Sequence, residues 1–328
     1  MDETVFDAII GHGRLKKQFI HLIQEDRLPH AMIFAGPSGI GKTMMAIAVA
    51  SAVVGRHVFP DLEARAGEAV AGDRDDAFYL APQGAMLKVD QFRRLQEELA
   101  LQGEIGKHRV CIIDHVETMN TEFANRMLKI LEEPPQGVCF ILITDQPDLL
   151  LPTIISRCAR FNFEPVSDEE MRAGLMRLRG SGDWDDAILW GGGIVRTVLS
   201  YLDGKATDKT HFALDFLTIL PHHTCPYAKW LSLTATLSDT ETAEILRWIT
   251  LFLRDMAVLQ SGAGRDYVRL KRYIQDMNKV LSDWPDEVIF PVLAVLNDAM
   301  EAISRHVNVR LVWDYVCIRT IQLIKGAH

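Results

Sequence analysis

The chain has 328 residues, of which 48% are hydrophobic and 24% are charged, and its formal net charge is −9. This length and composition predict a globular protein of two or three domains. No run approaches the roughly 18 apolar residues that a membrane-spanning helix needs, so a membrane-spanning protein is not expected. The negative charge argues against tight binding of nucleic acid by this chain alone. The N-terminus is acidic and lacks the basic segment of a secretory signal, which predicts a cytoplasmic protein with no membrane partner.

Apolar runs alternate with helical patterns in the first half of the chain, which predicts a parallel sheet flanked by helices. Amphipathic helices are expected at 91–103 and 123–135, and the second is ended by two prolines, Pro134 and Pro135. Strands are expected at 31–36, 77–82, 109–115, 138–144 and 160–165.

The strand pattern stops near Pro165, and the rest of the chain has a helical pattern. Ser167 and Glu170 have the spacing of a capping box at the start of a helix. Residues 241–262 have the length and period of one long core helix. Three domains are therefore expected: an α/β nucleotide-binding domain at 1–164, a small helical domain at 165–204 and an all-helical domain at 205–328.

A complete phosphate-loop motif, GPSGIGKT, follows the first expected strand and opens a helix. Glycines let such a loop wrap around phosphates with its N–H groups pointing inward. Lys42 is expected to bridge the β- and γ-phosphates of ATP, and Thr43 to bind Mg²⁺. The alternative is a glycine turn that binds nothing. The residues expected to contact the nucleotide in this loop are Gly36, Pro37, Ser38, Gly39, Ile40, Gly41, Lys42 and Thr43.

Asp114 ends an apolar strand, where a carboxylate can reach Mg²⁺; alone, it would be read as an ordinary strand-end residue. The next residue is His115, and a neutral imidazole is a poor replacement for a carboxylate in polarising an attacking water. Glu117 is expected on the same side as His115 if the strand continues. Weak or absent hydrolysis of ATP is therefore predicted.

Four segments together resemble the AAA+ clamp-loader subunits of bacterial DNA polymerase III, and the delta-prime subunits among them. The resemblance implies an α/β AAA+ domain, a small helical lid domain and an all-helical collar domain for oligomerisation. It also implies ATP with Mg²⁺ as cofactor, and as partners the gamma/tau and delta subunits, the sliding clamp, and primed DNA through the assembled complex. The four segments are 28–43, 87–99, 123–135 and 149–163, with looser matches at 248–262 and 306–316.

The resemblance assigns roles to several further residues. Arg157, within Ser-Arg-Cys, would act on the γ-phosphate held by a neighbouring subunit. A guanidinium suits this role because it is permanently charged and its planar fork matches phosphate oxygens. Without the resemblance, Arg157 would be interpreted as a member of a surface ion pair. Thr144 matches the sensor 1 position and Arg196 the sensor 2 position. Ile9 and Ile10 lie where the adenine pocket begins. Without the resemblance, Thr144 would be an ordinary residue at a strand end, and Arg196 an exposed arginine on a helix. Ile9 and Ile10 would simply be core side chains.

Many members of this family carry a four-cysteine zinc module after the phosphate loop. No cysteine lies in 55–78, where the module is expected, so the module is predicted to be absent or replaced by an acidic loop. The five cysteines of the chain form no CxxC pair and are expected to be reduced. No zinc is therefore expected.

Three functions remain open at this point. The first is a clamp-loader stator that binds ATP without efficient hydrolysis and donates Arg157 to a neighbour. The second is an active ATPase, either a gamma-like motor or a helicase loader, in which Thr43 and Asp114 are needed for turnover. The third is a scaffold whose phosphate loop no longer binds nucleotide.

Overall fold

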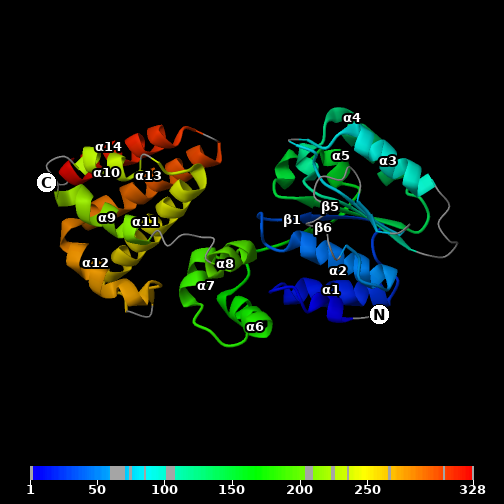
Figure 1. Ribbon diagram of the computed structural model, residues 1–328, viewed down its shortest axis with the longest axis horizontal. Coiled ribbons are helices and arrows are strands. Elements are labelled where there is room, and N and C mark those ends of the chain that lie inside the picture. The colour runs from blue at the N-terminus through cyan, green and yellow to red at the C-terminus, as the bar shows by residue number, and fades with distance from the viewer. Residues whose placement is uncertain are drawn as a thin grey trace. The chain divides into compact units, whose positions relative to one another are not determined.

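The structure is a computed structural model, which describes residues 3–59, 71–73, 76–84, 86–100, 108–203, 210–222, 226–234, 236–264, 267–305 and 307–326. The chain divides into two compact units, Met1–Asp203 and Gly204–His328 (Figure 1). The separation of 1–164 from a lid at 165–204 stays a prediction. Among the described helices, none combines the length and the apolar character that crossing a bilayer requires.

A six-stranded sheet with the order β2-β3-β4-β5-β1-β6 forms the centre of the first unit. Five strands are parallel, as predicted, and the edge strand β2 is antiparallel to β3. β2 lies in the segment where the cysteine module was expected to be absent or replaced, and it was not among the expected strands. The strands are β1 (Ala31–Ala35), β2 (Ala71–Asp73), β3 (Ala77–Leu80), β4 (Arg109–Ile113), β5 (Val138–Thr144) and β6 (Ala159–Asn162).

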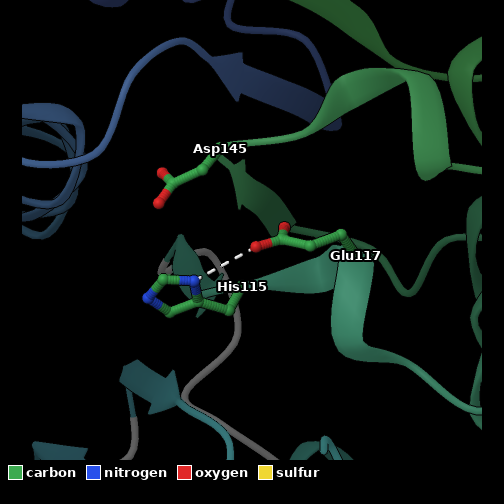
Figure 2. Close-up of side chains that lie close together, drawn as sticks. All are labelled: His115, Glu117 and Asp145. Atoms are coloured by element: carbon green, nitrogen blue, oxygen red, sulfur yellow. Dashed lines mark hydrogen bonds and ion pairs between the residues drawn. The ribbon is translucent and has the colours of Figure 1, made fainter. Parts of the chain in front are cut away.

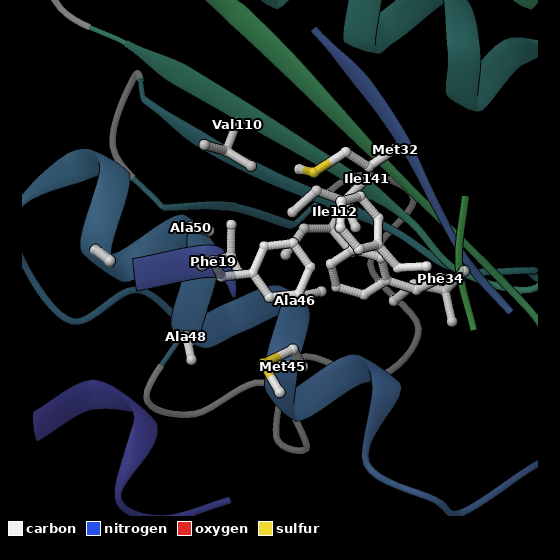
Figure 3. Packing of buried hydrophobic residues seen from close by; sticks show 14 of the residues in the cluster. Phe19, Met32, Phe34, Met45, Ala46, Ala48, Ala50, Val110, Ile112 and Ile141 are labelled. Carbon is white, nitrogen blue, oxygen red and sulfur yellow. The ribbon is translucent and has the colours of Figure 1, made fainter. Parts of the chain in front are cut away.

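Helices cover both faces of this sheet, which explains why its strands are continuously apolar. On one face Phe34 and Met32 pack with Phe19 of α1 and Met45 of α2 (Figure 3). On the other face Ile33 packs in a cluster with residues of α3, α4 and α5. Each large side chain buried in this way contributes about 1.5–3 kcal/mol. These helices are α1 (Gly13–Gln24), α2 (Lys42–Val54), α3 (Val89–Ala100), α4 (Thr121–Glu132) and α5 (Pro152–Ile155), with short 3₁₀ helices η1 (Glu3–Phe6), η2 (Val116–Thr118) and η3 (Pro147–Leu149).

Three further helices complete the first unit: α6 (Asp168–Arg179), α7 (Asp185–Gly191) and α8 (Val195–Leu202). They share a small core that includes Trp184 and Val198.

The start of α6 differs from the predicted capping box. Ser167 Oγ accepts the N–H of Glu170 at 3.2 Å, as expected. The carboxylate of Glu170 instead accepts the N–H of Gly13, also at 3.2 Å. A negative charge at the first turn of α1 is favourable, so this glutamate links two elements that are 157 residues apart in the sequence. A complete capping box is present at Ser238 and Glu241, which begin α11.

The second unit is helical throughout its described residues. Trp230, Trp284 and Trp313 are fully buried. The indole of Trp284 donates to Leu217 O at 2.9 Å, which satisfies a buried polar group. The elements are α9 (Thr210–His222), α10 (Pro226–Thr234), α11 (Asp239–Gln260), η5 (Lys271–Tyr273), α12 (Ile274–Val280), η6 (Leu281–Asp283), α13 (Asp286–Ser304) and α14 (Val309–Gly326).

Asp255, near the end of α11, is a buried carboxylate with a structural task. Its side chain is fully buried, and Oδ2 accepts the N–H of Leu270 at 2.6 Å. Oδ1 accepts from Arg254 at 2.7 Å. The carboxylate therefore ties the loop after α11 back onto the helix.

Replacing this carboxylate should destabilise the second unit. We expect Asp255→Ala to lower the free energy of unfolding by about 1–3 kcal/mol, because the buried N–H of Leu270 loses its acceptor. The measurement is urea unfolding followed by tryptophan fluorescence. Asp276→Ala is the control, since the exposed pair of Asp276 with Lys279 is expected to contribute less than about 1 kcal/mol. Equal unfolding curves for both variants would contradict the structural role of Asp255.

Candidate nucleotide site

The phosphate loop, Asp114 and Thr144 lie at the carboxyl ends of three adjacent parallel strands, β4, β5 and β1. The phosphate loop follows β1, Asp114 follows β4, and Thr144 ends β5. Ala35 of β1 is level with Thr144 in the sheet. This end of a parallel sheet is where α/β proteins hold ligands.

Glycines give the phosphate loop its shape. Gly39 and Gly41 have φ values of 74° and 112°, which favour glycine. A Cβ on Gly36 would lie 2.4 Å from Phe163 O, so any side chain there would collide with the backbone after β6. Pro37 and Ser38 are exposed, and Ile40 is fully buried. The loop thus has the glycine-dependent backbone that its motif requires, and phosphate binding there stays a prediction.

Lys42 lies inside this loop and is only 4% exposed. Its ammonium donates to Gly36 O at 2.7 Å and to Pro37 O at 2.8 Å. It also forms an ion pair of 2.6 Å with Asp145, the residue after β5. Asp145 was not among the predicted residues, although its place directly after a strand of the site was a signal that could have identified it. The ion pair fixes the Lys42 ammonium inside the loop.

Asp114 and Thr43 lie together, as expected for two residues that share a magnesium ion. The hydroxyl of Thr43 donates to Asp114 Oδ2 at 3.2 Å. Tyr79 of β3 donates to the same oxygen at 2.6 Å, and the backbone N–H of His115 donates to Oδ1 at 2.9 Å. Burial, followed by the neighbouring carboxylate, raises the pKa of Tyr79, so the phenol stays a donor. A hydroxyl beside a carboxylate is a suitable pair of oxygen ligands for Mg²⁺, and Tyr79 orients the carboxylate.

His115 and Glu117 are joined by a hydrogen bond (Figure 2). β4 ends at Ile113, two residues earlier than expected, and His115 has a φ of 52°. This turn, rather than a continued strand, brings Nδ1 of His115 to 3.1 Å from Oε1 of Glu117. The hydrogen bond raises the pKa of His115. Burial alone would raise the pKa of Glu117, but the hydrogen bond from His115 helps to lower it overall.

Thr144 and Arg196 both contact the loop region. Thr144 is fully buried, its carbonyl accepts the N–H of Gly36 at 3.3 Å, and its hydroxyl accepts the N–H of Gln146 at 3.0 Å. The backbone N–H of Arg196 donates to Gly39 O at 2.9 Å, so the start of α8 lies against the loop. The side chain of Arg196 is exposed.

Ile9 and Ile10 are each only 3% exposed. Ile9 belongs to the core beneath α1 and α2, and Ile10 packs with the core of α6 to α8. Ile9 O accepts from Lys16 and Arg177. This segment therefore joins the sheet region to the last three helices of the unit.

Arg157 lies just after α5, and its contacts are with α4 and α5 rather than with the loop. Its guanidinium forms an ion pair of 2.7 Å with Glu132 and donates to Thr153 O at 3.0 Å. About a third of the side chain, 36%, is exposed. The arginine is thus held in place but partly open to solvent.

His12 is a contact that the sequence did not indicate, since no motif marks it. Nε2 lies 2.9 Å from Ile40 O in the phosphate loop, and the residue is 8% exposed. Burial lowers the pKa of His12. The neutral ring, with its proton on Nε2, donates to the loop and stabilises its conformation.

Comparison with known proteins adds family relationships to this geometry. A family model described as "DNA polymerase III, delta subunit" matches residues 11–167, and one described as "DNA polymerase III, delta subunit, C terminal" matches residues 214–319.

Three relatives illustrate the similarity. The delta' subunit of DNA polymerase III from Bacillus subtilis is 34% identical over 166 residues, which are 50% of each chain. The delta' subunit from Pseudomonas aeruginosa is 36% identical over 139 residues, 40% of this chain and 42% of that one. The tau subunit from Bacillus subtilis is 21% identical over 346 residues, 97% of this chain and 61% of that one. The matches thus span about half the length of these relatives.

Acid should weaken the contact between His12 and the phosphate loop. Because burial lowers the pKa of His12 in the folded chain, its contribution to stability is complete above the unfolded pKa of about 6.5 and is lost as the pH falls below it. We expect His12→Asn to destabilise the protein by about 1 kcal/mol at neutral pH, and this difference to narrow on acidification. The measurement is urea unfolding at several pH values.

His21→Asn is the matched control, since His21 lies on α1 with a side chain 69% exposed. Its effect should be small at every pH. A difference between wild type and His12→Asn that stays constant with pH would contradict the burial of a neutral ring.

Proposed function

Because the chain belongs to the family of DNA polymerase III delta subunits that both matched models describe, we propose that it is a delta'-like stator of a clamp loader. In this role it binds ATP with Mg²⁺, hydrolyses it poorly or not at all, and donates Arg157 to a neighbouring ATPase subunit. Its partners are the gamma/tau and delta subunits, the sliding clamp, and primed DNA through the assembled complex.

Binding of ATP is supported by the arrangement of Lys42, Thr43 and Asp114 at one end of the sheet. On entry of a nucleotide, Lys42 would exchange its contacts with loop carbonyls for phosphate oxygens, and the N-terminus of α2 adds a favourable dipole. Thr43 and Asp114 would hold Mg²⁺, which neutralises phosphate charge when bound.

Poor hydrolysis is supported by the pair of His115 and Glu117, the observation on which the stator role chiefly depends. A general base needs a free lone pair close to the attacking water. The Nδ1 atom of His115 and the Oε1 atom of Glu117 are engaged with each other at 3.1 Å. These two atoms are therefore not free to take a proton from water.

The donation of Arg157 is supported by its partly exposed position beside Glu132. A half-exposed ion pair contributes little stability, so exchanging Glu132 for a phosphate of a neighbouring subunit costs little. The planar guanidinium can bind two phosphate oxygens at once.

A hydrolytically active ATPase of the gamma/tau kind is the alternative, favoured by the match to a tau subunit over 97% of this chain. Steady-state turnover by the isolated chain separates the two. A rate near roughly one per second, common among enzymes, would favour the active ATPase and overturn the stator.

Loss of the Lys42 ammonium should weaken nucleotide binding. We expect Lys42→Ala to reduce the affinity for a non-hydrolysable ATP analogue with Mg²⁺ by about 10- to 100-fold, since hydrogen bonds to charged groups contribute about 1.5–3 kcal/mol. Isothermal titration calorimetry measures this on the isolated chain. Lys17→Ala, at an exposed position of α1, should bind as wild type does. If wild type shows no affinity that depends on Lys42, the loop no longer binds nucleotide and the scaffold function is correct.

Loss of Arg157 should slow a neighbouring subunit rather than this one. In a complex reconstituted with the other clamp-loader subunits, Arg157→Ala should lower ATP turnover at the adjacent site by about 10³-fold while assembly persists. The assay is ATPase activity stimulated by clamp and primed DNA, with assembly followed by gel filtration.

Arg160→Ala provides the control, because Arg160 is an exposed arginine three positions away that bonds to Asn162. It should assemble and turn over normally. An assembled Arg157→Ala complex with unchanged turnover would show that this arginine does not act across the boundary.

A further inference from the structure

Asp145 makes a contact in the nucleotide site to which the proposed function gives no role. Its Oδ1 accepts from the Lys42 ammonium at 2.6 Å, and the side chains of Lys42 and Asp145 are only 4% and 21% exposed. The same ammonium donates to Gly36 O at 2.7 Å and to Pro37 O at 2.8 Å. An ammonium has three N–H donors, so these three acceptors engage all of them. A phosphate can therefore bond to Lys42 only by displacing one of the three.

Among the three acceptors, the Asp145 carboxylate is the strongest competitor of a phosphate. The carbonyl groups of Gly36 and Pro37 are neutral, whereas the carboxylate is anionic, as a phosphate oxygen is, and hydrogen bonds between charged groups are the stronger kind. Because Lys42 is almost fully buried, the ion pair is also less weakened by water than a pair at the surface.

The charge of Asp145 opposes a phosphate even where the phosphate displaces only the loop carbonyls. The phosphate loop, residues 36–43, contains a single cationic side chain, that of Lys42. A carboxylate oxygen 2.6 Å from the ammonium offsets this charge. Like charges brought together also repel each other. The carboxylate and an incoming phosphate therefore weaken each other's contact with Lys42.

The same ion pair stabilises the fold. Lys42 is a nearly fully buried ammonium, and a buried charge that loses its counter-ion is strongly destabilising. Asp145 thus has two effects of opposite sign, since it favours the folded chain and disfavours the binding of an anion. A carboxylate that only positioned Lys42 for phosphate would favour both, so the two roles can be distinguished.

We propose that Asp145 is an autoinhibitory residue of the phosphate loop, whose carboxylate competes with nucleotide phosphates for the Lys42 ammonium and so lowers the affinity of the chain for both ADP and ATP. This inference rests on the proposed binding of nucleotide and deepens it by naming the residue that limits that binding. The apparent affinity of a site whose binding-competent arrangement is only partly populated is reduced by that fraction. Removal of the carboxylate therefore tightens binding.

Calorimetric titration of the full chain with ADP and Mg²⁺ tests this role. Asp145→Asn keeps the size of the side chain and removes its charge, and should lower the dissociation constant by about tenfold or more. The same variant should melt at a lower temperature than wild type in the absence of nucleotide, because the buried ammonium loses its counter-ion. Adding Lys42→Ala should abolish the gain in affinity, since the carboxylate acts through the ammonium.

A second variant removes the charge in another way. Asp145→Ser keeps a hydroxyl acceptor for Lys42 and should also bind ADP more tightly than wild type, so the test does not depend on the folding of one variant.

Asp148→Asn is the matched control, because Asp148 is an exposed aspartate three positions further along the chain and its replacement changes the net charge equally. It should bind ADP as wild type does. If both Asp145 variants bind ADP equally to wild type or more weakly, while wild type binds through Lys42, the autoinhibitory role is overturned and nucleotide binding is not. If wild type and both Asp145 variants show no saturable binding, the autoinhibitory role and the proposed nucleotide binding are overturned together.

Discussion

The parallel pairing of β1 with β5 positions the other parts of the nucleotide site. Because Ala35 is level with Thr144, the phosphate loop leaves the sheet beside the residues that follow β5. The ion pair of Lys42 with Asp145 then joins the two segments. A slip of this register by one residue would turn every side chain of the strand to the opposite face. It would break the two cores of the unit and this ion pair together.

The charged groups at this end of the sheet are largely engaged with one another. Asp114 is fixed by three donors, and His115 and Glu117 bond to each other. The hydrogen bond between His115 and Glu117 raises the pKa of the ring and helps to lower that of the carboxylate, so it stabilises the charged form of each group. Poor hydrolysis of ATP, as proposed, would follow from this pairing.

The two units have different physical characters. The first depends on a sheet whose buried strands converge on a polar site. The second depends on aromatic packing among helices, in which buried indoles such as that of Trp284 find backbone partners. Asp255 lies in a segment that resembles the clamp-loader family, and in this fold it closes a loop by accepting the N–H of Leu270. The aspartate of this segment therefore has a local structural role in this fold.

The sequence by itself determined the parts of the protein that local pattern encodes. The parallel strands and the long helix near Trp248 follow from apolar runs, and the phosphate loop follows from a motif set between one strand and one helix. The closeness of Thr43 to Asp114, which are 71 residues apart, was expected from the motif and the family resemblance but depends on the order of the strands. Tyr79 and His12 could not be placed in this way, because one reaches the site through the order of strands and the other from a helix start far from the loop in sequence. Asp145 directly follows a strand of the site, but no motif encodes its ion pair with Lys42. Glu117 was expected beside His115 only if β4 continued; instead the early end of β4 and the left-handed backbone at His115 turn the chain there and bring the two side chains together. Only the tertiary structure decides such contacts, because the backbone turn and the neighbouring strands together determine which side chains meet.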